Sequence, residues 1–217
     1  LAGLREAFGP SVAIENDVDA AALAERTHGQ GRDRESFAFV HVGTGIGMGL
    51  VLGGRLHRGV HGVAGEIAFM PLSDEESSEA RRRGPLEAAA AASGIVRAAR
   101  TAGMRGAVSA RSVFAAAGRG DERAVAVVAQ EAKLVARAVC CVITVVDPEL
   151  IVLGGGIGQA PGFAAKVSEA LGAMTPVLPE VKVSALGTDV VVDGCLAEGA
   201  SLAWNQLTSG PLGHAAM

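Results

Sequence analysis

The sequence lacks tyrosine, has an aromatic content of only 3% and contains three cysteines among 217 residues. Cys140 and Cys141 are adjacent within an apolar run, Cys195 stands alone, and no C-x-x-C spacing occurs. We therefore interpret the cysteines as small buried hydrophobic residues of a reduced protein. This arrangement favours neither a disulfide framework nor a metal site.

Long apolar runs are also missing. The longest, from Ala138 to Val146, is far shorter than the roughly 20 residues that a membrane-spanning helix needs. The N-terminal stretch LAGLREAFGP has no apolar segment typical of a signal peptide. We expect a cytoplasmic protein with no membrane partner. The formal net charge of −4 disfavours binding to a phosphate backbone, so we do not expect this chain itself to bind nucleic acid.

The chain is rich in hydrophobic residues, at 49%, and it has 30 glycines. Apolar runs alternate with helical patterns, which is typical of an α/β protein. Asp17 is predicted to cap the first helix and Asp121 a long one, while residues 73–83 form an exposed polar excursion. The predicted strands are 37–42, 46–52, 151–153 and 181–186, and the predicted helices are 17–29, 85–103, 109–118, 121–147, 162–173 and 193–207.

Two glycine-rich turns are the first chemical signal. One follows the strand 37–42 and reads G-T-G-I-G-M-G from Gly43; the other follows 151–153 and reads G-G-G-I-G from Gly154. Glycine lets backbone N–H groups approach a phosphate closely, and Thr44 adds a hydroxyl donor. The first turn joins two strands, so it is not a Rossmann fingerprint, and no G-K-[ST] follows for a P-loop. Alone, either turn is equally well interpreted as a simple glycine turn.

The order of motifs along the chain is more specific. I-E-N-D-x-D-A-A-A-L-A-E is followed by V-G-T-G-I-G-x-G-L-V-L-x-G-R-L-H-R-G-x-H-G-x-A-G-E-I, then by G-P-L-E, then by D-P-E-L-I-V-L-G-G-G-I. This series resembles the ROK family of repressors, uncharacterised reading frames and sugar kinases, from about Val12 to Leu202. The resemblance implies the actin-like ATPase fold, related to ribonuclease H.

The resemblance also implies roles for individual residues. Asp17 matches the general base that accepts the sugar hydroxyl proton, and a carboxylate can do this chemistry. The substrate-binding residues implied are Asn16, Glu66, Glu87 and, at the position of the family's histidine, Phe69. The nucleotide-binding residues implied are Gly43, Thr44 and Gly45 in the phosphate loop, and Gly154, Gly155 and Gly156 in the adenosine loop.

Structural alternatives stand beside these roles. Asp17 before an alanine-rich helix could act only as an N-cap, and Glu87 could act only as an acid in a first helical turn. His57 and His61 are interpreted as surface histidines, and the run from Arg81 to Arg83 as a solvated charge run. Glu66, between a glycine and an apolar run, is better interpreted as a ligand than as a solvent-facing acid.

Three departures from the family pattern bear on function. Phe69 cannot ligate a metal, and the stretch before Leu86 has no cysteine or histidine where the family has its zinc ligands. We therefore expect no zinc, because structural zinc needs about four nitrogen or sulfur ligands. Asp19 replaces the second asparagine of the family's E-N-D-x-N, and a second carboxylate near Asp17 would raise the pKa of one of them if they approach.

The predicted organisation is a remnant of a small N-terminal lobe at 1–36, a large C-terminal ROK lobe at 37–207 and a tail at 208–217. The family's kinases begin with a D-x-G-x-T phosphate loop, and nothing similar occurs before Pro10. Because the first residue is Leu1, we expect a truncated chain that lacks part of the small lobe, and its exposed remnant favours a homodimer or higher oligomer.

Three functions remain open. The first is the sugar-sensing domain of a transcriptional regulator whose helix-turn-helix lies outside this chain, so that DNA is contacted only through the missing region. The second is an ATP- and magnesium-dependent sugar kinase acting on a hexose hydroxyl. The third is a vestigial pocket in a domain that mainly oligomerises. The departures at Phe69 and at the zinc segment lead us to favour the regulator over the kinase.

Overall fold

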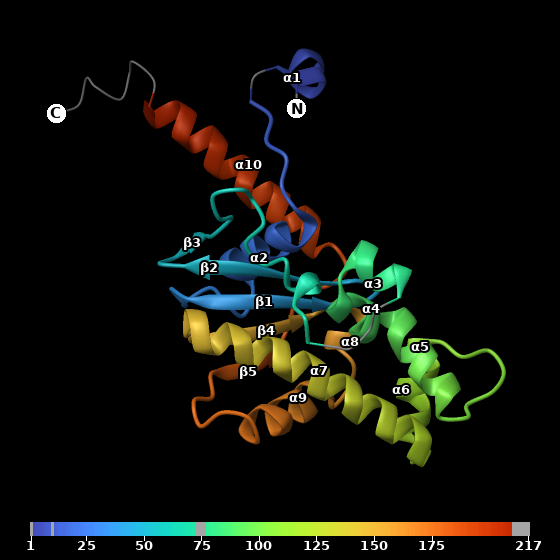
Figure 1. Cartoon of the computed structure of the whole chain (residues 1–217). Helices are drawn as coiled ribbons and strands as arrows, with labels where there is room; N and C mark the ends of the chain where they lie inside the picture. Colours follow the sequence, from blue (N-terminus) through green and yellow to red (C-terminus); the bar gives the residue numbers. More distant parts are fainter. Residues whose placement is uncertain (1, 10, 73–76, 210–217) are drawn as a thin grey trace.

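The computed structural model describes residues 2–9, 11–72 and 77–209 (Figure 1). Within that part, one mixed five-stranded sheet is surrounded by helices, as an α/β sequence predicts. In chain order the elements are α1 Ala2–Phe8, α2 Asp17–His28, β1 Phe37–Val42, β2 Ile46–Leu52, β3 Arg55–Leu56, η1 Ile67–Phe69, α3 Ser78–Arg83, α4 Pro85–Ala90, α5 Ala92–Thr101, α6 Ala110–Gly118, α7 Glu122–Val146, β4 Leu150–Gly154, α8 Gly155–Gly158, α9 Phe163–Gly172, β5 Glu180–Val183 and α10 Val190–Ser209.

The strand order is β3-β2-β1-β4-β5. β1 and β2 form the predicted antiparallel hairpin, and β4 lies parallel to both β1 and β5. Side chains on β1 alternate between the two faces of the sheet. Phe37 and Phe39 pack toward α2, whereas Ala38, Val40 and Val42 pack into the larger core beneath α4 to α7 and α9. The sheet therefore separates two hydrophobic cores and holds the carboxyl ends of β1 and β4 side by side.

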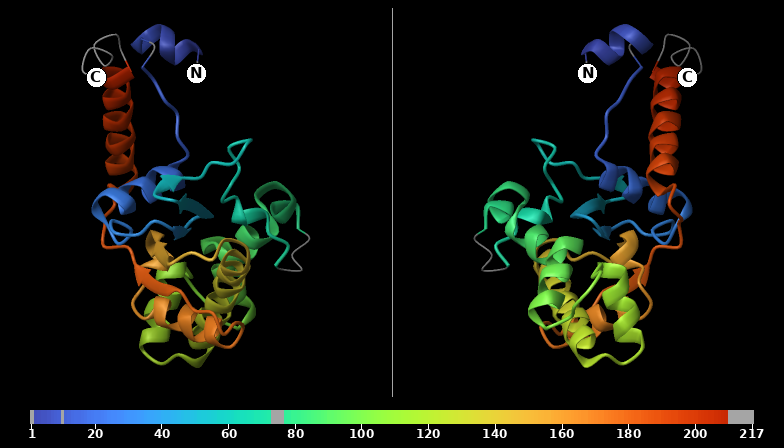
Figure 2. Two further views of the ribbon diagram at one scale, coloured as in Figure 1. Left: turned by 90° about the vertical axis from the view of Figure 1, so that its left-hand side faces the viewer. Right: turned by 90° about the vertical axis from the view of Figure 1, so that its right-hand side faces the viewer.

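The last helix, α10, packs against α2 and projects away from the sheet beside the N-terminal segment (Figures 1 and 2). The contact is very close at Gly194, where an added Cβ would lie 1.7 Å from the carbonyl oxygen of Ala20. The final helix therefore packs back onto the N-terminal region of the chain. Since α2 shares a core with β1, the predicted boundary between residues 36 and 37 does not coincide with a gap in packing, and that division stays a prediction.

Two predictions in the helical layer are wrong. The helix predicted at 85–103 is two helices, α4 and α5, because Ala91 is extended and the N–H of Ala92 donates to the carbonyl of Gly43, 2.9 Å away. The polar excursion predicted at 73–83 contains the helix α3, capped by Ser77; residues 73–76 lie outside the described part. Of the predicted tail, residues 208 and 209 continue α10, and 210–217 lie outside the described residues.

The described residues include no helix that is both long and apolar enough to cross a membrane.

Candidate active site

The candidate site lies where β1 and β4 end and α2 and α8 begin. His41 at the end of β1 pairs with Gly154 on β4 and with Gly47 on β2. The hairpin tip that follows is closed by a hydrogen bond from the N–H of Gly43 to the carbonyl of Gly45, 2.9 Å long. Both predicted glycine turns are therefore neighbours at one edge of the sheet.

A polar cavity of about 290 Å³ opens at this edge. It brings together Asn16, Asp17, Glu66 and Glu87, the four polar residues predicted for the sugar, with Gly45 of the hairpin tip. The complete lining is Asn16, Asp17, Val18, Asp19, His41, Thr44, Gly45, Ile46, Gly47, Met48, Gly62, Ala64, Gly65, Glu66, Arg83 and Glu87.

The start of α2 does not use Asp17 as its cap. Asn16, and not Asp17 as the sequence predicts, is the N-cap: its Oδ1 accepts from the N–H groups of Val18, at 2.8 Å, and Asp19, at 3.3 Å. Asp17 is the first helical residue, and one of its carboxylate oxygens accepts from the N–H of Val18. The cap interpretation of Asp17 is therefore wrong, because the neighbouring asparagine does that work.

The two glutamates differ in their surroundings. Glu66 precedes η1, makes no side-chain cap hydrogen bond and is exposed at the cavity wall. Glu87 lies in the first turn of α4, and its Oε2 accepts from the N–H of Ile46 at 2.9 Å. Its Oε1 pairs with Arg83, whose Nη2 also donates to the carbonyl of Thr44 at 3.1 Å. Glu87 thus supports the hairpin tip as well as facing the cavity.

Phe69, at the end of η1, is 56% exposed and is not among the described residues that line this cavity. Its predicted contact with a sugar stays a prediction.

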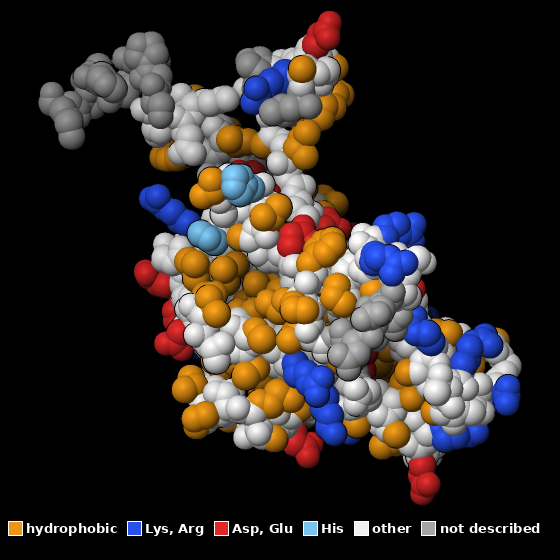
Figure 3. Space-filling view, viewed as in Figure 1, with side chains coloured by type: hydrophobic (Ala, Val, Ile, Leu, Met, Phe, Trp, Pro, Cys, Tyr) orange, Lys and Arg blue, Asp and Glu red, His pale blue; other side chains and the backbone are white. Residues whose placement is uncertain are grey.

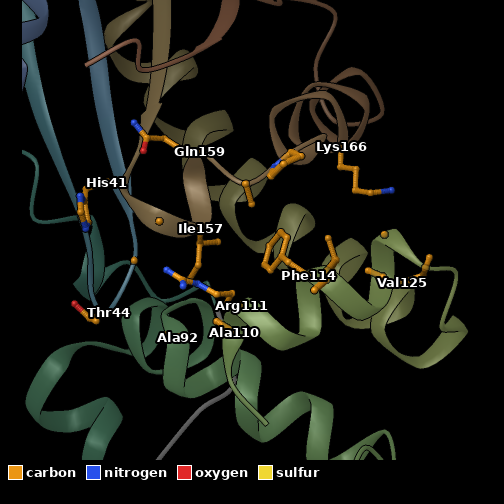
Figure 4. Close-up of a pocket in the computed structure, with 18 residues that line it drawn as sticks. His41, Thr44, Ala92, Ala110, Arg111, Phe114, Val125, Ile157, Gln159 and Lys166 are labelled. Carbon is orange, nitrogen blue, oxygen red and sulfur yellow. The ribbon is translucent and has the colours of Figure 1, made fainter. Parts of the chain in front are cut away.

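A second, larger cavity of about 940 Å³ lies between the glycine turns and the helical layer (Figure 4). His41 and Thr44 lie on one side of it and Phe114 and Lys166 on the other, with Ile157 of α8 between. The lining consists of His41, Gly43, Thr44, Ala92, Ala110, Arg111, Phe114, Ala115, Ala117, Gly118, Val125, Val128, Gly156, Ile157, Gln159, Ala160, Pro161 and Lys166. A mostly apolar wall with a few basic side chains suits a flat base and its phosphates.

A third cavity, of about 390 Å³, connects the start of α2 with the second glycine turn. Asp17 and His41 line it together with Gly154, Gly155 and Gly156. Glycine is required at 155, where φ is +77° and an added Cβ would lie 2.5 Å from the carbonyl oxygen of Val42. Of the predicted nucleotide-binding glycines, Gly43 lines the 940 Å³ cavity, Gly154 and Gly155 line the 390 Å³ cavity and Gly156 lines both, whereas Gly45 lines the 290 Å³ cavity.

Charged residues of opposite sign meet beside the 290 Å³ cavity. Asp19 is only 6% exposed, and burial raises its pKa to about 6, helped by the negative charge of Glu15 and opposed by Arg58. Arg58 pairs with Glu15 and, at 3.1 Å, with Glu198 of α10. Arg58 therefore ties the segment before α2 to the last helix. On the surface, arginine side chains gather over α3, α5 and α6 (Figure 3).

Three residues at this site are not among those that the sequence predicts for it: His41, Asp19 as a buried wall residue, and Arg83. Arg83 was interpreted as part of a solvated run, yet its ion pairs with Glu79 and Glu87 fix it at the wall. The signal for His41 was available, because it is a lone polar residue at the end of an apolar strand and immediately precedes a glycine turn.

Comparison with known proteins decides the family. The ROK family model matches residues 1–204. The chain belongs to the ROK family. Solved members share the actin-like sugar kinase fold, in agreement with the fold that the sequence predicted.

Relatives of this ROK chain include named sugar kinases. A bifunctional enzyme NanE/NanK of Brucella suis is 40% identical over 189 residues, which is 87% of the chain and 34% of that protein. The N-acetylmannosamine kinase of Citrobacter koseri is 39% identical over 81% of the chain and 59% of that enzyme. The chain thus spans about a third of the first relative and somewhat less than two thirds of the second.

Solved structures include both functional branches. The ROK hexokinase of Thermus thermophilus superposes with a TM-score of 0.82 and 34% identity, covering 95% of this chain and 70% of that one. A ROK transcriptional regulator, a homologue of the E. coli Mlc protein, gives a TM-score of 0.80 and 27% identity, covering 93% and 55%. The more identical relatives are therefore the kinases, which favours the second of the functions left open by the sequence over the first.

Proposed function

We propose that this ROK chain forms the catalytic part of an ATP-dependent sugar kinase, with the sugar in the 290 Å³ cavity and the nucleotide in the 940 Å³ cavity. The observation that carries the proposal is the shared wall. His41 and Thr44 line both cavities, and Asp17 stands in the smaller one, so a sugar hydroxyl and a terminal phosphoryl group can meet there.

The reaction follows from the residues present. The Asp17 carboxylate accepts the proton of the sugar hydroxyl as its oxygen attacks the terminal phosphorus. The bond from that phosphorus to the leaving diphosphate then breaks. Backbone N–H groups of the hairpin tip, with the hydroxyl of Thr44, stabilise the charge on the transferred group.

A magnesium ion, when bound, would neutralise charge on the nucleotide phosphates. Within the described residues, no three His, Cys, Asp or Glu side chains gather to hold a metal. Such an ion would be held mainly by phosphate oxygens and water.

The sugar we propose is an N-acetylated hexosamine. N-acetylmannosamine is the first to test, because similar relatives from Citrobacter koseri and Escherichia coli are named N-acetylmannosamine kinases. Carboxylate and amide side chains at the wall suit a polyhydroxylated ligand, since each carboxylate oxygen accepts hydrogen bonds.

The test is a coupled assay of ADP release across a panel of hexoses and N-acetylhexosamines. Because the chain spans only part of its relatives, the whole gene product is used. Turnover of one sugar well above the rate without sugar supports the proposal. Sugar binding without any ADP release overturns it.

A second candidate, a sugar-sensing regulator domain, is favoured by the likeness to the ROK regulator and by Phe69 at the family's histidine position. A helix-turn-helix encoded upstream, with specific DNA binding released by a sugar, supports this alternative. The predicted homodimer or higher oligomer is compatible with either function, and light scattering checks it.

A further inference from the structure

The 290 Å³ and the 940 Å³ cavity share a wall. Of the described residues, only Thr44 and His41 line both the 290 Å³ and the 940 Å³ cavity. Thr44 belongs to the predicted phosphate loop. His41 does not, and it also lines the third cavity together with Asp17. A group that passes from the nucleotide to the sugar must pass beside these two side chains.

The backbone explains why an imidazole fits at this point. His41 is flanked across the sheet by Gly47 and Gly154, neither of which has a side chain to cover it. An added Cβ on Gly43 would lie 2.7 Å from Nε2 of His41, and one on Gly155 would lie 2.9 Å from its Cε1. The ring is therefore seated between the two glycine turns, with its Nε2 against the hairpin tip.

We propose that His41 contacts the phosphoryl group in transfer and donates a hydrogen bond from its ring N–H to a non-bridging oxygen; this rests on the proposed kinase function. The proton stays on His41 throughout. The sugar oxygen gains the bond to phosphorus, ADP leaves with the electron pair of the broken bond, and Asp17 takes the hydroxyl proton. A donor fixed in advance at the developing charge stabilises the transition state more than the bound substrate.

The electrostatics agree with His41 as hydrogen-bond donor and Asp17 as base. Burial lowers the pKa of His41, against the opposing charge of Asp17. A neutral ring offers one N–H donor and does not neutralise the carboxylate beside it, so Asp17 remains available as the base.

The experiment compares His41→Ala, His41→Gln and the control His57→Ala, a histidine exposed on the loop after β3, in the whole gene product. We expect His41→Ala to lower kcat by about 100-fold, the usual effect of losing one such donor, with the sugar KM within about threefold of wild type. His41→Gln, which keeps an N–H donor, recovers part of kcat. His57→Ala is unchanged.

The second readout is the ratio of the rates with ATP and with ATPγS, in which sulfur replaces a non-bridging oxygen. Loss of a direct contact changes this ratio, by about tenfold if the contact contributes about 1.4 kcal/mol. A side chain that only maintains the fold leaves it unchanged. If His41→Ala proves unstable, the test rests on His41→Gln, provided that its melting temperature equals that of the wild type.

The outcomes separate the two claims. A wild-type protein that phosphorylates no sugar overturns the proposed function, and the role of His41 falls with it. A wild-type kinase whose His41 variants keep both kcat and the ATP to ATPγS ratio overturns only the role of His41. Parallel losses of kcat and sugar affinity with an unchanged ratio also overturn it, because they indicate a structural role.

Discussion

The Glu87 carboxylate accepts a hydrogen bond from the backbone N–H of Ile46, 2.9 Å away, and so joins the first turn of α4 to the tip of the β1–β2 hairpin. The other oxygen pairs with Arg83, which holds the carbonyl of Thr44. One acid therefore supports the turn that is predicted to bind phosphate while it faces the cavity that is predicted to bind sugar.

Replacing Glu87 with alanine should weaken the turn as well as the cavity. The side chain is 15% exposed, and losing it leaves the N–H of Ile46 without its acceptor, so we expect a loss of about 1–3 kcal/mol of unfolding free energy. Urea denaturation measures this. Glu79→Ala removes another carboxylate bound by Arg83 but distant from the hairpin, and it should cost less than about 1 kcal/mol. Equal losses in both variants would contradict the supporting role.

Asp17→Asn should separate chemistry from binding. Asn16 keeps capping α2, so the helix start stays intact, but no carboxylate remains to accept the hydroxyl proton. We expect kcat to fall by about 10² to 10⁴ while sugar affinity, measured by calorimetry, changes little. Retention of normal turnover in the asparagine variant would remove Asp17 from the mechanism.

Asp19 should make stability depend on pH. The unfolded chain releases this proton near 3.8 and the folded chain near 6, so the stabilisation from this group is complete below 3.8 and is lost as pH rises through about 6. At pH 8 the cost corresponds to about 3 kcal/mol. Asp19→Asn should therefore be more stable than wild type at pH 8, with the advantage shrinking toward pH 4. Chemical denaturation at several pH values checks this, with Asp33→Asn, at an exposed position, as control; parallel curves for wild type and Asp19→Asn contradict it.

Two glycines of α10 should respond oppositely to alanine. An added Cβ at Gly194 meets the Ala20 carbonyl, whereas at Gly199 nothing lies within 4 Å. We expect Gly194→Ala to destabilise by about 1–3 kcal/mol and Gly199→Ala to stabilise by up to about 1 kcal/mol. Thermal melts distinguish them. A neutral Gly194→Ala would mean that α10 does not pack on α2 as described.

Filling the larger cavity should affect only the nucleotide. Ala115 lines it and is otherwise exposed, so Ala115→Trp adds bulk without disturbing a core. We expect at least about a tenfold rise in the KM for ATP with the sugar KM unchanged. Val145→Trp, at a position 84% exposed on α7, is the matched control. If the sugar KM rises instead, the assignment of the two cavities is reversed.

The alternation of apolar runs and helical patterns predicted the β1–β2 hairpin, β4, α7 and the class of the fold, because strong periodicity over a long segment leaves few alternatives. Helix ends were harder to predict, because neighbouring residues compete for the same capping position. Asn16 and Asp17 are both good N-caps, and only the backbone angles decide that Asn16 is used. Ala91 lies in an alanine-rich stretch with every reason to be helical, but the hydrogen bond from Ala92 to Gly43 breaks the helix there.

Site residues that belong to a sequence motif could be predicted. Site residues whose role depends on tertiary contacts could not. Asp17 and Glu66 were found because they sit in family motifs, and they do line one cavity. Arg83 and His41 belong to no motif. Their roles depend on which elements the fold brings beside them, and a single sequence does not record that.

The amide of Ala92 is bonded to the carbonyl of Gly43, so the first residue of α5 and the hairpin tip are joined through one proton. The rate of deuterium uptake at that amide would then report how often the hairpin tip opens, separately from the unfolding of either core. A nucleotide that binds the hairpin tip should slow deuterium uptake at the Ala92 amide, and a sugar alone should not. Measuring the uptake with each ligand would therefore report the order in which they bind.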